Sequence, residues 1–238
     1  MDHIRRRSLI VLGAFVAAAG CAQSSRKSVD GAVAPWRDTF GVDPGIMSPV
    51  GVNPFLPLRP GNAWTYRDGA TTLTVKVLDE VESVDGVSTR VLEEREESGG
   101  ALKEVSRNFL AIDPASRDVY YFGEEVDIYS AGQAVTHEGA WRSGVGGARF
   151  GLFLPGSPRV GDRYYQEVAP GVALDRVEVV SVDERVETPA GAFEHCLHLR
   201  ETTPLERGTG NKWFAPGVGL VKDGGLVLVS HTVPPATR

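Results

Sequence analysis

The chain has 238 residues, 42% of them hydrophobic and 24% charged, with 28 Gly and 15 Pro. These values exclude a disordered chain and a multi-span membrane protein. Two Cys exclude a disulfide-rich scaffold, and no Cys/His spacing matches a zinc module. The first twenty residues hold three Arg and one Asp, so their removal takes the net charge from -6 to -8. We therefore expect no nucleic-acid partner, because nucleic acid requires a basic face.

The N-terminus predicts a lipoprotein signal peptide over residues 1–20. Three arginines (5–7) precede an apolar run from Leu9 to Ala19, and this run is shorter than the roughly twenty residues needed to cross a bilayer. It ends at Ala18-Ala19-Gly20-Cys21, which resembles the bacterial lipobox. The resemblance implies that Cys21 is the first mature residue and carries acyl chains, two or more of which give durable membrane anchoring.

The alternative is an ordinary signal peptide with an incidental cysteine near its end. Ala22 follows Cys21, at the position where Asp signals inner-membrane retention in many Gram-negative lipoproteins. We therefore expect the periplasmic face of the outer membrane, with the N-terminal lipid as the membrane partner.

A tether is predicted over residues 21–54. Six of the fifteen prolines lie between Ala22 and Pro60, and this density excludes regular elements. The stretch from Pro35 onward carries Trp36, Phe40 and Phe55, which we expect to dock on the globular domain. That domain is predicted over residues 55–233, and a short tail follows at 234–238.

The domain shows short runs of period-two alternation. Leu73, Val75 and Val77 alternate with polar residues, which predicts a half-buried strand. Asp85-Gly86 then predicts a tight hairpin, because this pair tolerates a positive φ. The stretch 93–105 comes nearest to a helix, but it contains Gly99-Gly100. Further strands are predicted at 109–112, 119–122, 126–129, 150–154, 164–168, 172–186, 193–203, 212–215, 220–222 and 226–230.

This pattern predicts a mainly β fold with little helix apart from the signal peptide. About ten short strands with hairpin-length links form a single antiparallel meander sheet. Such a sheet must protect its edges by curling into a half-barrel, a barrel or a sandwich.

No catalytic, metal-binding or cofactor-binding residue is assigned, and no cofactor is expected. Cys196 and His198 share one face of a strand, but side chains two residues apart stand about 6 to 7 Å from each other, too far for a nucleophile and its base. We expect a buried structural cysteine instead. Glu124, Glu125 and Asp127 lack the spacing of a calcium loop, so we interpret them as solvated hairpin charges.

Aromatic residues are the candidates for ligand contact. Adjacent aromatics in Tyr120-Tyr121-Phe122 and Tyr164-Tyr165 must face both sides of a sheet, so some line a cavity, pack under a loop or meet a partner. The candidate contact residues are Tyr120, Trp141 and Tyr165. The alternative is that they pack beneath the Pro-rich segment.

Three segments together resemble a large group of uncharacterised bacterial envelope lipoproteins. They are Pro57 to Tyr66, then Thr188-Pro189-Ala190-Gly191-Ala192-Phe193 with Cys196, then Trp213-Phe214-Ala215-Pro216-Gly217-Val218-Gly219-Leu220-Val221-Lys222. The resemblance implies a secreted β-rich domain without established catalytic residues. More distantly, the layout is similar to the open half-barrel of the lipoprotein-localisation factors, which cup acyl chains.

Three functions remain open at this point. The first is a non-catalytic, lipid-anchored module that binds an apolar or extended ligand or a partner protein. The second is an envelope assembly subunit without a small-molecule pocket. The third is a hydrolase whose His, Asp and Glu residues come together from distant strands.

Overall fold

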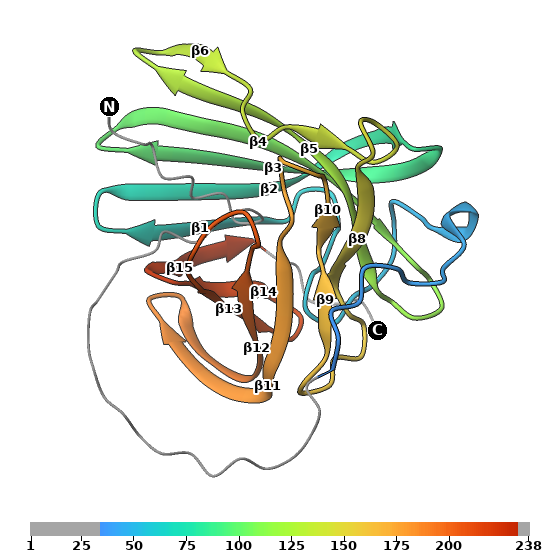
Figure 1. The fold of residues 1–238 in the computed structure, drawn as a ribbon. Helices are drawn as coiled ribbons and strands as arrows, with labels where there is room; N and C mark the ends of the chain where they lie inside the picture. The colour runs from blue at the N-terminus through green and yellow to red at the C-terminus, as the bar shows by residue number, and fades with distance from the viewer. Residues whose placement is uncertain (1–33, 233–238) are drawn as a thin grey trace.

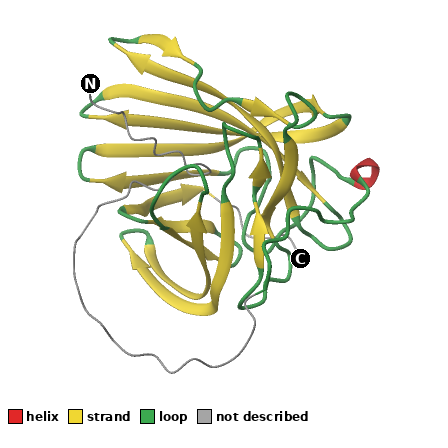
Figure 2. Cartoon of the chain, viewed as in Figure 1, coloured by secondary structure: helices red, strands yellow, loops and turns green. Residues whose placement is uncertain are grey.

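A computed structural model describes residues 34–232 (Figures 1 and 2). The described chain is built from strands, and within it the one helical element is a 3₁₀ turn, η1 (Pro44–Ile46). The predicted mainly β fold is therefore confirmed. Cys21 and the signal peptide lie outside the described residues, as does the tail at 234–238.

Fifteen strands form one sheet. In chain order they are β1 (Ala63–Asp68), β2 (Thr71–Val84), β3 (Val87–Ser98), β4 (Ala101–Ile112), β5 (Val119–Ser130), β6 (Gln133–Thr136), β7 (Trp141–Arg142), β8 (Arg149–Leu154), β9 (Arg163–Tyr165), β10 (Glu167–Val168), β11 (Arg176–Thr188), β12 (Gly191–Thr202), β13 (Gly210–Ala215), β14 (Gly219–Asp223) and β15 (Leu226–Thr232).

The sheet is an antiparallel meander that nearly closes into a barrel. Its order is β10-β8-β5-β4-β3-β2-β1-β15-β14-β13-β12-β11-β9, with β6 and β7 attached to β5. The first strand thus pairs with the last. The remaining gap is bridged by residues 163–168, because β9 pairs with β11 while β10 pairs with β8. The prediction of one curled antiparallel sheet is confirmed, and of the predicted forms it comes nearest to a barrel.

Glycine permits the close approach at this seam. A Cβ on Gly151 of β8 would lie 2.4 Å from the Gln166 carbonyl oxygen. Any larger residue there would push β8 away from the bridging segment, so the seam depends on the missing side chain.

The hairpin turns follow local sequence. Asp85 and Gly86 have φ of 52° and 78° and join β2 to β3, as predicted. Gly99 and Gly100 also have positive φ, 59° and 78°. They turn β3 into β4, so the glycine pair that interrupts the helix-like stretch is a second hairpin.

The core fills the inside of the curled sheet. Along β2, Thr71, Leu73, Val75 and Val77 are buried on alternate positions, because successive side chains of a strand point to opposite faces. Buried aromatic rings pack on both faces of the sheet: Tyr121 of β5 hydrogen-bonds to Asn108, whereas the adjacent Phe122 faces the other side and stacks on Phe150 at 4.8 Å.

Strand β12 departs from its predicted alternation. His195 adopts a left-handed φ of 57°, and the pairing of β11 with β12 shifts register on both sides of Cys196. As a result Cys196 and Leu197 are both fully buried, while His198 lies on the half-buried outer face. Cys196 is nevertheless the register partner of Glu184, whose carboxylate lies 2.9 Å from a His198 ring nitrogen, so the expectation that Cys196 and His198 share a face stands.

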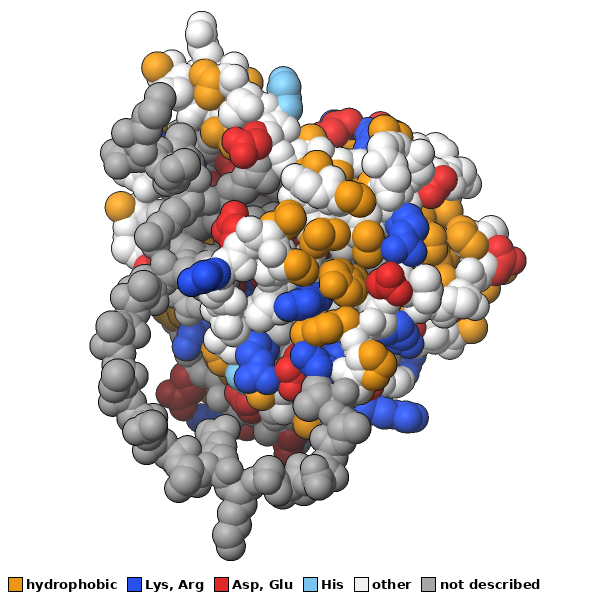
Figure 3. Space-filling view, viewed as in Figure 1, with side chains coloured by type: hydrophobic (Ala, Val, Ile, Leu, Met, Phe, Trp, Pro, Cys, Tyr) orange, Lys and Arg blue, Asp and Glu red, His pale blue; other side chains and the backbone are white. Residues whose placement is uncertain are grey.

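The Pro-rich lead, residues 34–60, packs on the sheet. The Trp36 ring meets Tyr165 edge-on at 6.4 Å and lies 4.0 Å from the Arg163 guanidinium. Phe40 meets Tyr120 at 5.7 Å. The predicted docking of these aromatics is confirmed. Figure 3 shows hydrophobic side chains gathered over the region where Figure 1 places β8 and the lead.

Further along, the lead covers one end of the barrel, which we call the closed end. Ser48 pairs with Ile112 at the end of β4, and the Gly217 amide in the β13–β14 turn donates to Pro54 O at 2.7 Å. Arg90 is buried and donates to Pro49 O at 3.2 Å.

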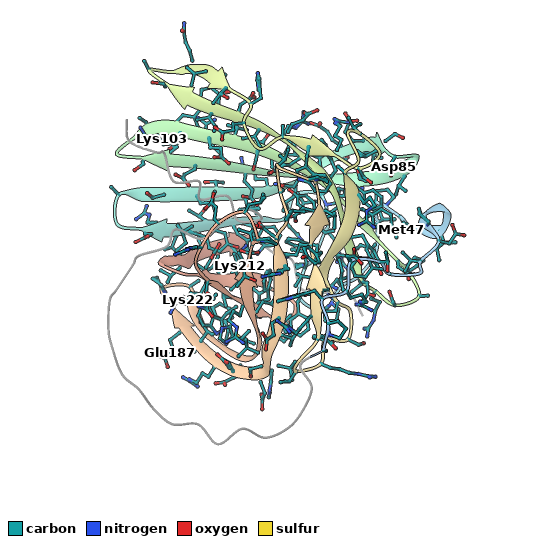
Figure 4. The ribbon with its side chains drawn as sticks, viewed as in Figure 1. Met47, Asp85, Lys103, Glu187, Lys212 and Lys222 are labelled. Carbon is teal, nitrogen blue, oxygen red and sulfur yellow. The ribbon has the colours of Figure 1, made fainter. Side chains whose placement is uncertain are left out.

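The opposite end, which we call the mouth, carries the β1–β2, β3–β4 and β5–β6 turns. Figure 4 shows Lys103 at the mouth, and Asp85 and Met47 toward the closed end.

Candidate functional site

The predicted contact residue Tyr120 lies in the core. It is buried, and its ring meets both Phe40 of the lead and Phe150 of β8 edge-on, at 5.7 and 5.8 Å. Burial, with the nearby Asp118 and Asp113 carboxylates, raises the pKa of its hydroxyl far above the usual value. Tyr120 therefore holds the lead against the sheet.

Trp141 and Tyr165 lie apart from each other. Trp141 is buried in β7, edge-on to Tyr121 at 5.1 Å. Tyr165 is half-buried in β9 beside Trp36. The structure does not bring the three predicted contact residues into one pocket, and the pocket described next is lined by others.

A pocket of about 660 Å³ lies at the mouth. It is lined by the ends of β2, β3, β4 and β5 and by the β5–β6 turn: Thr71, Glu96, Ser98, Ala101, Leu102, Lys103, Ile128, Tyr129, Ser130, Ala131 and Gly132. Its size falls within the range that takes a drug-sized ligand.

The register of β2 and β3 shows on which face of the sheet the pocket lies. Leu73 is buried in the core and is the register partner of Glu96, which lines the pocket. Directly paired residues point to the same face of a sheet. The pocket therefore lies on the inner face, above the core.

Charged side chains are buried inside the barrel between the two ends. Six carboxylates from strands around the wall and from the β10–β11 link are at most 8% exposed: Glu94, Glu124, Glu167, Asp175, Glu201 and Asp223. Lys212, labelled in Figure 4, is near Glu201, Asp223 and Asp175. It forms an ion pair with Glu201, with Nζ 2.9 and 2.8 Å from the two carboxylate oxygens. Burying a charge is costly unless it is paired.

Two of these acids hold their protons more strongly than usual. Burial, and then the Glu201 carboxylate, raises the pKa of Asp175 to about 7, although Lys212 opposes the shift. Burial and the neighbouring Asp175 also raise the pKa of Glu167 well above its usual value. The Glu167 carboxylate accepts the Asp175 amide hydrogen at 2.6 Å.

The burial of these acids differs from the prediction for Glu124. Glu124 is 1% exposed, so its interpretation as a solvated charge is wrong. It lies on the inner face of β5, whereas its neighbour Glu125 is exposed and pairs with Arg142. The alternation of the strand could have predicted the burial of Glu124, because Glu124 and the buried Val126 are two residues apart and point to the same face.

A separate cluster lies on the outer face of β11, β12 and β13. The two ring nitrogens of His198 lie 2.9 Å from Glu184 Oε1 and 2.9 Å from Asn211 Oδ1. The Trp213 indole stacks on His198 at 4.4 Å and donates to Glu184 Oε2 at 2.7 Å. Partial burial raises the pKa of Glu184, but the hydrogen bonds from Trp213 and His198 outweigh it and lower the pKa below its usual value.

Cys196 is a free, buried cysteine, as predicted. Burial raises the pKa of its thiol to about 11, which keeps it protonated near neutral pH. Within residues 34–232, no group of three or more His, Cys, Asp or Glu side chains is arranged to hold a metal ion. The same part of the chain has no helix with the length and apolar character of a membrane span.

Comparison with known proteins identifies no family for this chain. No protein-family model matches the chain, and a search of curated proteins found no match. Among solved structures, a putative lipoprotein from Parabacteroides distasonis ATCC 8503 aligns over 76% of this chain and 99% of its own, with 14% identity and a TM-score of 0.37.

Proposed function

We propose that this chain is a lipid-anchored envelope protein that works as a non-catalytic binding module, with the mouth pocket as its ligand site. The observation that carries the binding part is the pocket of about 660 Å³ on the inner face of the sheet. The anchoring part is supported by the sequence, in which a short apolar leader ends at Cys21.

The pocket walls suit binding better than chemistry. Ala101, Leu102 and Ile128 supply aliphatic surface. The Thr71 and Ser98 hydroxyls lie 3.3 Å apart and hydrogen-bond to each other. Apolar walls with a few placed polar groups are the usual make-up of a small-molecule site.

Co-purification tests the ligand site. The full chain is purified from its own envelope, and bound small molecules are identified by native mass spectrometry and lipid extraction. We expect a ligand with the natural chain and none with Leu102→Arg, which places a charged side chain across the pocket. Val182→Arg, at an exposed position of β11 away from the pocket, is the matched control. If neither the natural chain nor the control carries a ligand, the binding proposal fails.

Membrane fractionation tests the anchor. We expect the natural chain in the outer-membrane fraction and Cys21→Ser in the soluble periplasmic fraction. A Cys21→Ser chain that stays with the membrane would overturn lipid anchoring at this residue.

An assembly role is the second candidate, and the lead favours it. The part of the lead that crosses the closed end exposes three aliphatic side chains within seven residues: Ile46 (51% exposed), Val50 (58%) and Val52 (60%). Exposed aliphatic clusters of this kind mark protein–protein contacts. Cross-linking from position 50 in the native envelope tests this role: a specific partner protein supports it, and no cross-linked product argues against it.

A further inference from the structure

The sheet closes at its seam, residues 163–168, through few backbone pairs. β9 pairs with β11 at three positions, and β10 pairs with β8 at two. By contrast, β2 and β3 are paired at eleven positions. A junction with so few backbone hydrogen bonds opens locally at a lower free energy than the long strands around it. The seam is therefore the place where the closed sheet opens most easily.

Two carboxylic acids lie on opposite sides of this junction. Glu167 belongs to β10 and is 0% exposed, and Asp175 directly precedes β11 and is 2% exposed. Glu167 Oε1 accepts the Asp175 amide hydrogen at 2.6 Å. The Gln166 amide donates to Asp175 O at 2.8 Å. The two edges of the sheet are thus joined through the residues that carry these acids.

The charged groups that act on the pair are mostly negative. Burial is the largest cause of the raised pKa values of Glu167 and Asp175, and three further carboxylates from other elements add to it: Glu124 of β5, Glu201 of β12 and Glu206 of the β12–β13 link. Lys212 of β13 and a hydrogen bond with the Thr203 side chain lower the pKa of Asp175. Lys212 is already paired with Glu201 at 2.8 Å. Among the described residues that act on the pair, no unpaired cation remains.

Each acid also has one buried oxygen without a hydrogen-bond partner among the described residues: Glu167 Oε2 and Asp175 Oδ2. An ionised carboxylate in that position carries an uncompensated charge in a low-dielectric interior, whereas a protonated one is neutral. When both acids are ionised, they also repel each other across the junction. Ionisation of the pair therefore favours a state in which the junction has opened and water reaches the carboxylates.

We propose that Glu167 and Asp175 make the seam a pH-sensitive closure of the sheet. The junction stays closed while the pair holds a proton, and it opens more often once that proton is lost. Opening here would give water lateral access to the interior that holds Lys212 and Glu201. This inference depends neither on the mouth pocket nor on the lipid anchor.

Hydrogen–deuterium exchange of the full chain between pH 5 and pH 7 tests the closure, with rates corrected for the intrinsic effect of pH on exchange. The amides of Gln166 and Asp175 are both donated within the seam, so they report its opening. The amides of β2 report unfolding of the whole chain. We expect the seam amides to exchange about tenfold faster than those of β2, or more. Their opening constant should rise about tenfold per pH unit, as for release of one proton.

Two variants remove one ionisable group each. Asp175→Asn should reduce the rise in the opening constant to about twofold per pH unit or less. Glu167→Gln keeps an oxygen for the Asp175 amide and should also reduce the rise. Glu187→Gln, at an exposed position of β11, is the matched control and should leave it unchanged. Thermal unfolding at pH 5 checks that each variant remains folded.

Either of two results would overturn the proposal. Seam amides that exchange no faster than those of β2 would show that the junction opens only when the whole chain unfolds. A pH dependence that persists in both variants would show that other groups release the proton. If neither variant folds, the comparison of seam and β2 amides in the natural chain still decides.

Discussion

The two ends of the barrel are built differently. At the closed end, the lead satisfies backbone groups of the turns that it crosses. Asn53, for example, donates to Arg117 O at 2.8 Å and accepts the Phe55 amide hydrogen at 2.8 Å. At the mouth, glycine-containing turns surround a pocket. We therefore expect stability to be concentrated where the lead lies, with a smaller contribution from the mouth.

The largest loss in the free energy of unfolding should come from breaking the ion pair in the charged interior between the two ends. Lys212→Met leaves the buried Glu201 carboxylate without its cation, and we expect the free energy of unfolding to fall by roughly 3–5 kcal/mol. Chemical denaturation of the full chain measures this. The double variant Lys212→Met/Glu201→Leu should recover much of the loss, because both charges are then gone. A loss below about 1 kcal/mol in the single variant would contradict the structural role of the ion pair.

The closed end should be the more sensitive of the two ends. Asn53 is 2% exposed, so Asn53→Ala leaves a buried carbonyl and a buried amide without partners. We expect a loss of about 1–3 kcal/mol in the free energy of unfolding. Gln133→Ala, an exposed amide at the mouth, is the comparison and should change it by less than about 0.5 kcal/mol. Equal losses would remove the contrast between the ends.

The pH dependence of the free energy of unfolding should show the raised pKa of Asp175. Its pKa is raised to about 7 in the folded chain from an ordinary value of 3.8, so the folded state holds the proton more strongly. Its contribution to stability is fully present below about pH 4 and is lost as the pH rises through about 7. Asp175→Asn, which imitates the protonated acid, should flatten this decline. Unfolding at pH 5, 6, 7 and 8 measures it, and an unchanged slope would refute the assignment.

The smallest effect is expected at the mouth. Ser98→Ala removes the hydrogen bond to the Thr71 hydroxyl, in a half-exposed position where water replaces the partner. We expect the free energy of unfolding to change by less than about 0.5 kcal/mol. A loss comparable with that of Asn53→Ala would show that the mouth carries stability as well.

Local signals were enough to predict the fold class. The Asp85-Gly86 turn and the alternation from Leu73 to Val77 depend only on neighbouring residues, and the structure confirms both. The Gly99-Gly100 hairpin was visible as a break in a possible helix, but its strands were not. Closure of the sheet depends on residues 163–168 pairing with β8 on one side and β11 on the other, and on β1 pairing with the distant β15; local pattern encodes neither.

The candidate site could not be predicted in the same way. Glu94, Glu124 and Glu201 come from β3, β5 and β12, and only the curled sheet makes them neighbours in one interior. An acidic residue in a strand is usually solvated, so Glu124 was assigned to the surface. The adjacent aromatic residues do pack against another part of the chain, but that part is the lead and not a ligand pocket: Tyr120 packs on Phe40 and Tyr165 on Trp36.

The pairing of β1 with β15 has a consequence for how the chain is made. Ala63 lies opposite Thr232, so one edge of β1 stays uncovered until almost the whole domain has been delivered. Contacts between such distant residues form slowly. A chain that emerges N-terminus first therefore remains incomplete and open to chaperones until its last strand arrives, whatever the stability of the finished wall.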